Sequence, residues 1–237
     1  MISRVHSMVL QGIDATACEV EVDVVRGGTG EFNLVGLPDA AVKESISRVQ
    51  SAMRNCGYRW PGPKVTIGLA PADVKKEGPA FDLPIALGVM LAGGELESER
   101  HGKYLILGEL ALDGRLRHVK GALAAAMLAR SMEMTGILLP RANAREAAVV
   151  DGIEVIGCEN LTQAVAFLTG ELEIEPTEVD LETVFHAAAR YDLDFGDVRG
   201  QAAAKRALTV AAAGHHNLLM IDPPGSGETV YESRRSY

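Results

Sequence analysis

Residues 69–86 read Leu-Ala-Pro-Ala-Asp-Val-Lys-Lys-Glu-Gly-Pro-Ala-Phe-Asp-Leu-Pro-Ile-Ala, and they connect an expected strand to an expected helix. Residues 64–69 alternate between polar and apolar side chains, which predicts a strand. Residues 83–94 are almost entirely apolar, which predicts a buried helix. We expect Asp82 to be the N-cap of that helix, because a carboxylate there satisfies free backbone N–H groups. A strand, a structured loop and a buried helix in succession favour a mixed α/β domain.

The segments before this stretch continue the same pattern. Residues 18–25 alternate strictly, which predicts a half-buried strand, and residues 8–13 and 31–35 are its expected neighbours. A helix is predicted after residues 36–39, with one apolar face. The apolar positions of that face are Val42, Ile46, Val49 and Met53.

The segments after it alternate between short strands and helices. Asp113-Gly114 is a hairpin signal, and the acidic, proline-containing residues 171–181 predict a linker. We therefore expect a first domain over residues 1–170, a linker over 171–196 and a second domain over 197–237. The expected elements are strands at 104–110, 135–139, 154–157 and 217–221, and helices at 121–131, 141–149, 161–168 and 201–213.

Composition excludes several classes of protein. Of the 237 residues, 47% are apolar and 23% are charged, as in an ordinary globular protein. The net charge of −9 gives no general attraction to nucleic acid, and the closest approach to a basic run is Arg234-Arg235. No apolar run is long enough to cross a membrane. The widely separated Cys18, Cys56 and Cys158 favour buried thiols in a reducing cytosol, so we expect a cytoplasmic protein without membrane contact.

Four segments stand out for their length and their order along the chain. They are 32–45 (FNLVGLPDAAVKES), 69–86, 108–114 (GELALDG) and 197–214 (DVRGQAAAKRALTVAAAG). In order and spacing they resemble the YifB/ComM branch of the magnesium-chelatase-like AAA+ ATPases, and the resemblance covers the chain to about Thr229.

The resemblance implies a fold, a cofactor and partners. The first domain of such proteins has the α/β (α+β) fold of ribosomal protein S5 domain 2, which the proteolytic domain of Lon shares, and an AAA+ module follows it. Members bind ATP and Mg²⁺ and form rings. Those linked to competence are ATP-driven motors that migrate DNA branches during natural transformation. DNA and further copies of the chain are therefore the expected partners.

The second domain contains what resembles an altered ATP-binding loop. A P-loop reads Gly, four residues, then Gly-Lys-Ser/Thr; its backbone N–H groups hold phosphates, its lysine reaches the outer phosphates and its hydroxyl binds Mg²⁺. Here Asp222 stands at the first glycine and Glu228 at the lysine. The nucleotide-binding residues of this degenerate loop are Asp222, Pro223, Pro224, Gly225, Ser226, Gly227, Glu228 and Thr229, with Thr229 as the Mg²⁺ ligand of a functional loop.

Both substitutions argue against ATP use by this chain. Repulsion between a carboxylate and a phosphate charge at ~4 Å is about 4 kcal/mol at an effective dielectric constant of about 20. Residues 230–237 match nothing in the family pattern, and no Walker B segment follows the loop. We therefore expect a truncated family member, from a frameshift or a gene remnant, that has no catalytic residue and lacks ATPase activity.

Two alternatives remain open. The first is a non-catalytic interaction or assembly domain that acts through rings, which ATP-dependent oligomerisation would distinguish. The second is a Lon-like peptidase, in which a serine follows a Gly-Pro pair and a lysine further along acts as its base. Here Ala80 follows Gly78-Pro79, and the lysine position falls near Leu123, with Lys120 close by. Alanine has no nucleophile, so we do not expect a peptidase.

Several other polar residues carry no functional signal of their own. Lys75, Lys76 and Asp82 are interpreted as caps and ion-pair partners in a rigid loop. Asp14, His118 and His186 are interpreted as solvated surface.

Overall fold

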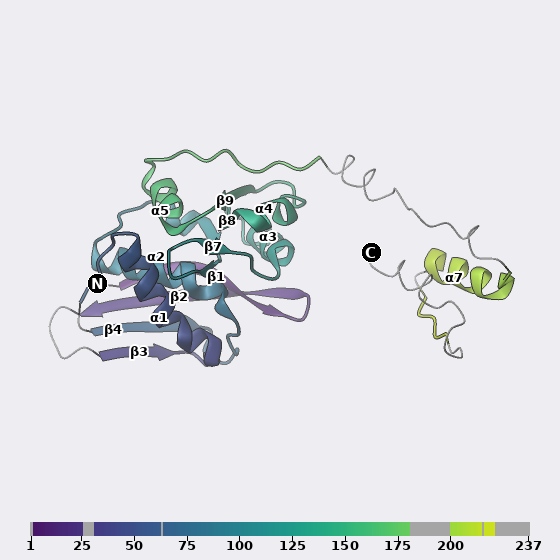
Figure 1. The fold of residues 1–237 in the computed structure, drawn as a ribbon, viewed down its shortest axis with the longest axis horizontal. Coiled ribbons are helices and arrows are strands. Elements are labelled where there is room, and N and C mark those ends of the chain that lie inside the picture. Colours follow the sequence, from purple (N-terminus) through teal and green to yellow (C-terminus); the bar gives the residue numbers. More distant parts are fainter. Residues whose placement is uncertain (1, 26–30, 63, 181–199, 215, 221–237) are drawn as a thin grey trace. The chain divides into compact units, whose positions relative to one another are not determined.

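The structure is a computed structural model, in which the described residues are 2–25, 31–62, 64–180, 200–214 and 216–220. The chain divides into two units, Met1–Val179 and Asp180–Tyr237. The first unit combines antiparallel and parallel strands with helices, so its fold is mixed α/β, as expected (Figure 1).

The first sheet has four strands in the order β1-β2-β4-β3. β1 (Ile2–Gln11), β2 (Asp14–Val25) and β4 (Lys64–Ala70) are antiparallel neighbours, and β3 (Glu31–Val35) runs parallel to β4. The alternation predicted for β2 is confirmed, because one face carries buried apolar side chains and the other carries half-buried, mostly acidic ones. The buried side chains of β2 are Cys18, Val20, Val22 and Val24.

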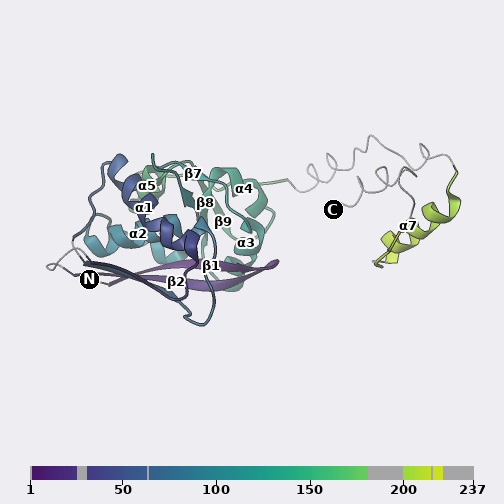
Figure 2. The same cartoon turned by 60° about the horizontal axis from the view of Figure 1, so that its bottom comes forward.

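Two helices cover the apolar face of this sheet. α1 (Ala40–Asn55) and α2 (Asp82–Gly93) pack against each other, and α2 also packs against β1 and β2. Figure 2 shows both helices on the same side of the sheet. The four apolar positions predicted for α1 are buried, and residues 82–92 of α2 are all buried, as its apolar composition predicts.

The second sheet is parallel, in the order β5 (Tyr104–Ile106), β8 (Gly136–Pro140) and β9 (Glu154–Cys158). In β8, Leu138 joins the core around α2, whereas Ile137 and Leu139 pack with α3 and α4. Both faces are therefore buried, as is usual for parallel strands. The remaining elements of the unit are α3 (Ala122–Ser131), α4 (Arg141–Ala147), α5 (Leu161–Thr169), the hairpin strands β6 (Glu109–Leu110) and β7 (Leu116–Arg117), and single 3₁₀ turns at Pro79–Phe81 and His101–Lys103.

The strand predicted at 104–110 is wrong in its extent. The chain bends at Gly108, whose N–H donates to Ala80 O at 2.9 Å and whose carbonyl accepts from Leu83 N at 2.9 Å. β5 ends before this bend and β6 begins after it. The backbone groups of Gly108 are therefore used to hold the start of α2 rather than to extend a strand.

The predicted capping role of Asp82 is also wrong. Asp82 is the first residue of α2 and makes no capping hydrogen bond. Its carboxylate, 0% exposed, accepts from Arg48 Nε at 2.8 Å, from Arg48 Nη2 at 3.0 Å and from Leu110 N at 3.2 Å. Because Arg48 belongs to α1 and Leu110 to β6, one buried carboxylate joins three elements. Burial raises the pKa of Asp82, and the hydrogen bonds from Arg48 and Leu110 oppose that rise.

Residues 171–179 are bound along the first unit. Thr177 N donates to Val155 O at 2.8 Å, Ile174 packs against the core, and Glu173 pairs with Arg100 at 2.7 Å. The first unit therefore includes the beginning of the segment for which the sequence predicts a linker.

In the second unit, α7 (Ala202–Gly214) matches the predicted helix. Residues 217–220 are not a strand, contrary to expectation. A strand needs a neighbour for its backbone hydrogen bonds, and no described residue of this unit forms one.

Replacing Arg48 should leave the Asp82 carboxylate buried without its cation. We expect Arg48→Met to lower the free energy of unfolding by about 3 kcal/mol near neutral pH. Removing the cation raises the pKa of folded Asp82 further above that of the unfolded chain. The stability that such a group contributes is fully present below its pKa in the unfolded chain and is lost as the pH rises through its pKa in the folded chain. The loss of unfolding free energy caused by Arg48→Met should therefore shrink as the pH falls.

Urea unfolding between about pH 8 and about pH 5 checks this expectation. Arg54→Met, in the exposed last turn of the same helix, makes the same chemical change and should cost little at either pH. A deficit in Arg48→Met that stays constant with pH would show that the carboxylate is not the group left uncompensated.

A chain of residues 1–179 should unfold cooperatively and be more stable than residues 1–170. The shorter chain loses the Thr177–Val155 hydrogen bond and the packing of Ile174, together about 1–3 kcal/mol. Thermal unfolding of the two chains checks this, with Ile174→Ala in the longer chain expected to reproduce part of the loss and exposed Glu175→Ala expected to reproduce none. Equal melting temperatures would mean that residues 171–179 do not stabilise the unit.

Candidate functional site

The predicted nucleotide-binding residues, from Asp222 to Thr229, lie outside the described residues, and so does His186. The geometry of the altered P-loop therefore stays a prediction. The first unit, however, contains a pocket whose construction is visible in full.

Buried polar side chains mark the surroundings of this pocket. Such groups are rarely buried unless they are hydrogen-bonded, so their positions are informative. Five polar side chains are buried among the described residues, and four of them hold elements around one pocket. These four are Ser45, Lys76, Asp82 and Asn143, and the fifth is Ser7 in β1.

Lys76 holds the loop between β4 and α2 in shape. Its side chain is fully buried, and its Nζ donates to the carbonyl oxygens of Pro71 and Val74. Its backbone N–H donates to Leu37 O at 3.1 Å. A buried ammonium needs such partners, and they are carbonyl oxygens rather than the acids that the sequence led us to expect. Lys76 therefore fixes this loop internally and against the loop before α1.

Asp39 completes the connection between these two loops. Its N–H donates to Lys76 O at 2.9 Å. Its carboxylate caps α1 at Val42 N, at 2.8 Å, and accepts from Gly78 N at 3.2 Å. The N-terminus of α1 and the Gly78-Pro79-Ala80 turn are therefore held by one side chain, and the Asp82–Arg48–Ser45 hydrogen bonds hold the following residues.

Asn143 in α4 holds the opposite wall. Its Oδ1 accepts from Val119 N at 2.9 Å, and its Nδ2 donates to Val119 O at 2.8 Å. Two residues after Val119, Gly121 adopts a φ of +82°, and a Cβ there would lie 2.8 Å from Leu10 Cδ1. The backbone of residues 118–121 is therefore fixed against both α4 and β1.

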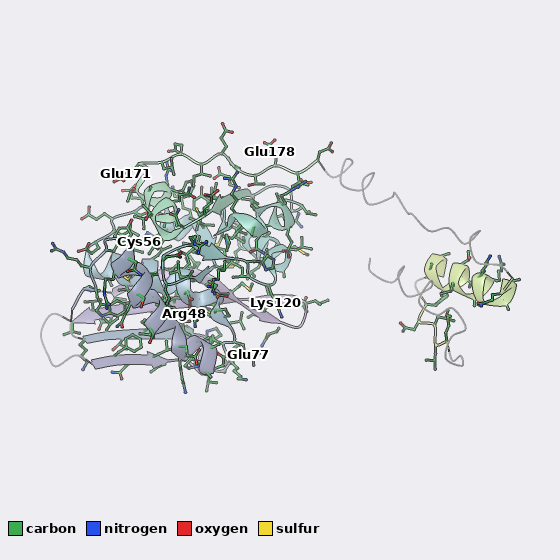
Figure 3. The ribbon with its side chains drawn as sticks, in the orientation of Figure 1. Arg48, Cys56, Glu77, Lys120, Glu171 and Glu178 are labelled. Carbon is green, nitrogen blue, oxygen red and sulfur yellow. The ribbon has the colours of Figure 1, made fainter. Side chains whose placement is uncertain are left out.

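The pocket enclosed by these walls has a volume of about 510 Å³, within the usual range for ligand sites. Apolar side chains form one part of its lining and charged ones the other. The lining residues are Met8, Leu10, Asp39, Glu77, Gly78, Pro79, Ala80, Phe81, Glu109, His118, Val119 and Lys120. Figure 3 labels Glu77 and Lys120, which come from opposite walls.

The pocket contains one of the two positions that a Lon-like peptidase would use. Ala80 and Lys120 both line it, whereas Leu123, the aligned position for the lysine, does not. The methyl group of Ala80 offers no nucleophile. The arrangement can therefore bind a ligand between Ala80 and Lys120 but has no serine to acylate.

Sequence reasoning missed two residues of this site. His118 is exposed, as expected, yet it also lines the pocket. Asn143 lies in a helix whose exposure could not be predicted, and its two hydrogen bonds to Val119 depend on tertiary packing. Once the fold is known, the burial of Asn143 points to the wall at residues 118–121, because a buried amide needs hydrogen-bond partners.

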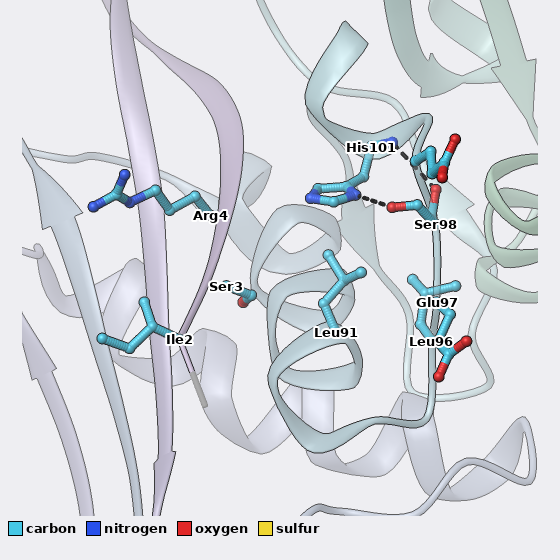
Figure 4. A pocket seen from close by; sticks show the side chains of 9 residues that line it. Ile2, Ser3, Arg4, Leu91, Leu96, Glu97, Ser98 and His101 are labelled. Carbon is cyan, nitrogen blue, oxygen red and sulfur yellow. Dashed lines mark hydrogen bonds between the residues drawn. The ribbon is translucent and has the colours of Figure 1, made fainter.

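A second pocket, of about 730 Å³, lies between the start of β1 and residues 96–101 (Figure 4). Ser98 there holds its own loop, because its Oγ donates to Leu168 O and its carbonyl oxygen lies 2.7 Å from His101 Nδ1. None of the five buried polar side chains of the described residues hydrogen-bonds to a residue that lines this second pocket, whereas Asn143 holds Val119 of the smaller pocket through two hydrogen bonds, so the smaller pocket is the better candidate.

Other reactive groups are few in the described part of the chain. Burial raises the pKa of the Cys18 thiol to about 11 and that of the Cys158 thiol to about 12, so both stay protonated near neutral pH. The described residues contain no cluster of His, Cys, Asp and Glu able to hold a metal ion. No helix among them has the length and apolar character needed to cross a membrane.

Comparison with known proteins identifies the relatives of this chain. Residues 20–143, just over half of the chain, match the family described as subunit ChlI of Mg-chelatase, and residues 194–236 match magnesium chelatase, subunit ChlI. Competence protein ComM of Haemophilus influenzae is 40% identical over 231 residues, and YifB of Escherichia coli is 39% identical over 236 residues. These alignments cover 97% and 98% of this chain but 45% of each relative.

The second match corrects one prediction. Residues 230–236 fall within the matched range, so the tail is not foreign to the family. The chain spans about 45% of the length of its curated relatives, and it contains the ChlI-type region and the beginning of the magnesium-chelatase region. These matches show that the chain belongs to the ComM/YifB family of magnesium-chelatase-like proteins.

Proposed function

We propose that this chain belongs to the magnesium-chelatase-like AAA+ proteins whose full-length members use ATP, as rings, to remodel DNA in the cytoplasm, and that this chain itself lacks ATPase activity. The match of residues 194–236 to the magnesium-chelatase family supports the ATP-linked half of this proposal, and the relative named competence protein ComM supports the DNA-linked half. The four-stranded sheet covered by α1 and α2 supports an S5 domain 2-like fold for the first unit.

Within that framework, the altered loop of this chain does not use ATP. Glu228 places a carboxylate where a P-loop lysine neutralises the outer phosphates, and Asp222 adds a second one. Phosphoryl transfer depends on positioning and charge neutralisation. Two carboxylates beside a polyphosphate oppose both, since each repels the phosphate charges.

The first unit acts as a non-catalytic binding module, and one observation carries this second part of the proposal. Four buried polar side chains hold a pocket in which Ala80 occupies the nucleophile position. Burying polar groups to order loops is typical of a preorganised site. A site built in this way, without a nucleophile, is suited to binding rather than to peptide cleavage.

The parent chain should show no binding of Mg-ATP by calorimetry and no phosphate release. Asp222→Gly combined with Glu228→Lys should recover weak phosphate binding without turnover, because Gly225, Gly227 and Thr229 are still present. Glu175→Lys makes the same charge change outside the loop and should recover nothing. Micromolar affinity in the parent, or sustained hydrolysis in any of these variants, would mean that the loop is not the phosphate site or is not impaired.

The chain should not cleave casein. A contaminating protease is recognised because its activity does not scale with purified chain, and a second nucleophile is recognised because its activity survives Ala80→Gly. Casein turnover that scales with the amount of purified chain, in both the parent and Ala80→Gly, would contradict the assignment of a non-catalytic pocket.

A further inference from the structure

The charged groups of the pocket around Ala80 are not equally satisfied. Asp39 accepts from two backbone N–H groups, Glu77 pairs with Lys75 at 2.6 Å and Glu109 pairs with Arg117 at 3.2 Å. All three acids of the lining therefore have partners.

The two basic groups of the lining differ from the acids. His118 and Lys120 make no hydrogen bond or ion pair through their side chains in the part of the chain that the structure describes. They flank the buried Val119, whose backbone Asn143 holds on both sides. The two available hydrogen-bond donors thus enter the pocket from a fixed backbone, which lowers the entropy cost of using them.

The apolar part of the lining determines what else a ligand must carry. Met8, Leu10, Pro79 and Phe81 contribute hydrocarbon surface next to the basic pair. A volume of about 510 Å³ exceeds that of a single small anion. A ligand complementary to this lining combines one negative group with an apolar side chain.

A nucleic acid fits this lining poorly. Its successive phosphates would bring several negative charges against a wall that includes Glu77, Asp39 and Glu109. A single carboxylate reaches the basic pair without a second charge meeting the acids, and these acids can instead accept backbone N–H groups of the ligand.

We propose that this pocket binds a polypeptide through a carboxylate that adjoins an apolar side chain, with Lys120 and His118 holding the carboxylate. The free carboxyl end of a chain that finishes in an apolar residue has this chemistry. The proposal rests on the non-catalytic binding role assigned above to the first unit and adds its ligand class.

The test is a titration of the full chain, with isotope-labelled methionine methyl groups, against acetyl-Ala-Ala-Leu bearing a free carboxylate. Met8 lines the pocket, whereas Met53 lies on the buried face of α1 outside the pocket and serves as an internal control. We expect the Met8 methyl resonance to shift at about 1 mM peptide, and the same peptide with a terminal amide to cause no shift.

Variants assign the contact to Lys120. Lys120→Met should weaken binding about tenfold or more, since it removes a hydrogen bond between charged groups, and Lys120→Arg should retain most of it. Lys103→Met, the same change at an exposed lysine outside the pocket, should bind like the parent. Equal shifts with acid and amide, or unchanged binding by Lys120→Met, would overturn the proposal.

Three further outcomes test this inference, and the first two separate it from the proposed function. Cleavage of the peptide, seen by mass spectrometry after the titration, would mean that the pocket is catalytic and that both are wrong. A peptide that is neither bound nor cleaved would overturn the inference and leave the non-catalytic role standing. A shift of Met8 with a short DNA duplex, but not with the peptide, would assign the pocket to nucleic acid instead.

Discussion

The ion pair between Arg48 and Asp82 is the contact on which the rest of the first unit depends. Asp82 is fully buried at the start of α2, and its carboxylate reaches α1 through Arg48 and β6 through Leu110. A carboxylate without solvent is tolerated only when its hydrogen-bonding capacity is used. The relative positions of these three elements are therefore restricted to those that bring their donors to one point.

The requirement that a buried polar group use its hydrogen-bonding capacity also applies around the pocket. Lys76 and Asn143 are buried with partners that are almost all backbone groups, so each orders a loop that apolar packing alone would leave adaptable. Hydrophobic burial stabilises the sheets and helices, but it is non-directional. Directional hydrogen bonds from buried polar groups are what give the pocket walls a defined geometry, and they are concentrated at this one place in the unit.

The two units differ in the sign of the charged groups that their candidate sites offer to a ligand. In the first unit the acids of the pocket are matched by partners, and the unmatched groups are basic. In the second unit the altered loop carries acids at both positions where a P-loop needs a glycine and a lysine. Membership of the magnesium-chelatase-like family does not by itself decide activity, because phosphate binding depends on the charge at individual positions.

Local periodicity was enough to predict β2 and the buried face of α1, and the Asp113-Gly114 pair was enough to predict the hairpin, because these patterns are properties of consecutive residues. The family was indicated by the resemblance of four motif segments in their order and spacing. An altered P-loop was likewise predicted from spacing, and it stays a prediction. Tertiary packing was needed to show that Asp82 binds Arg48 instead of capping α2, that the chain bends at Gly108, and that His118 and Lys120 line one pocket with Ala80. These partners lie tens of residues apart in the sequence, and which of several possible hydrogen bonds a polar group makes is set by the packing that brings one donor within reach.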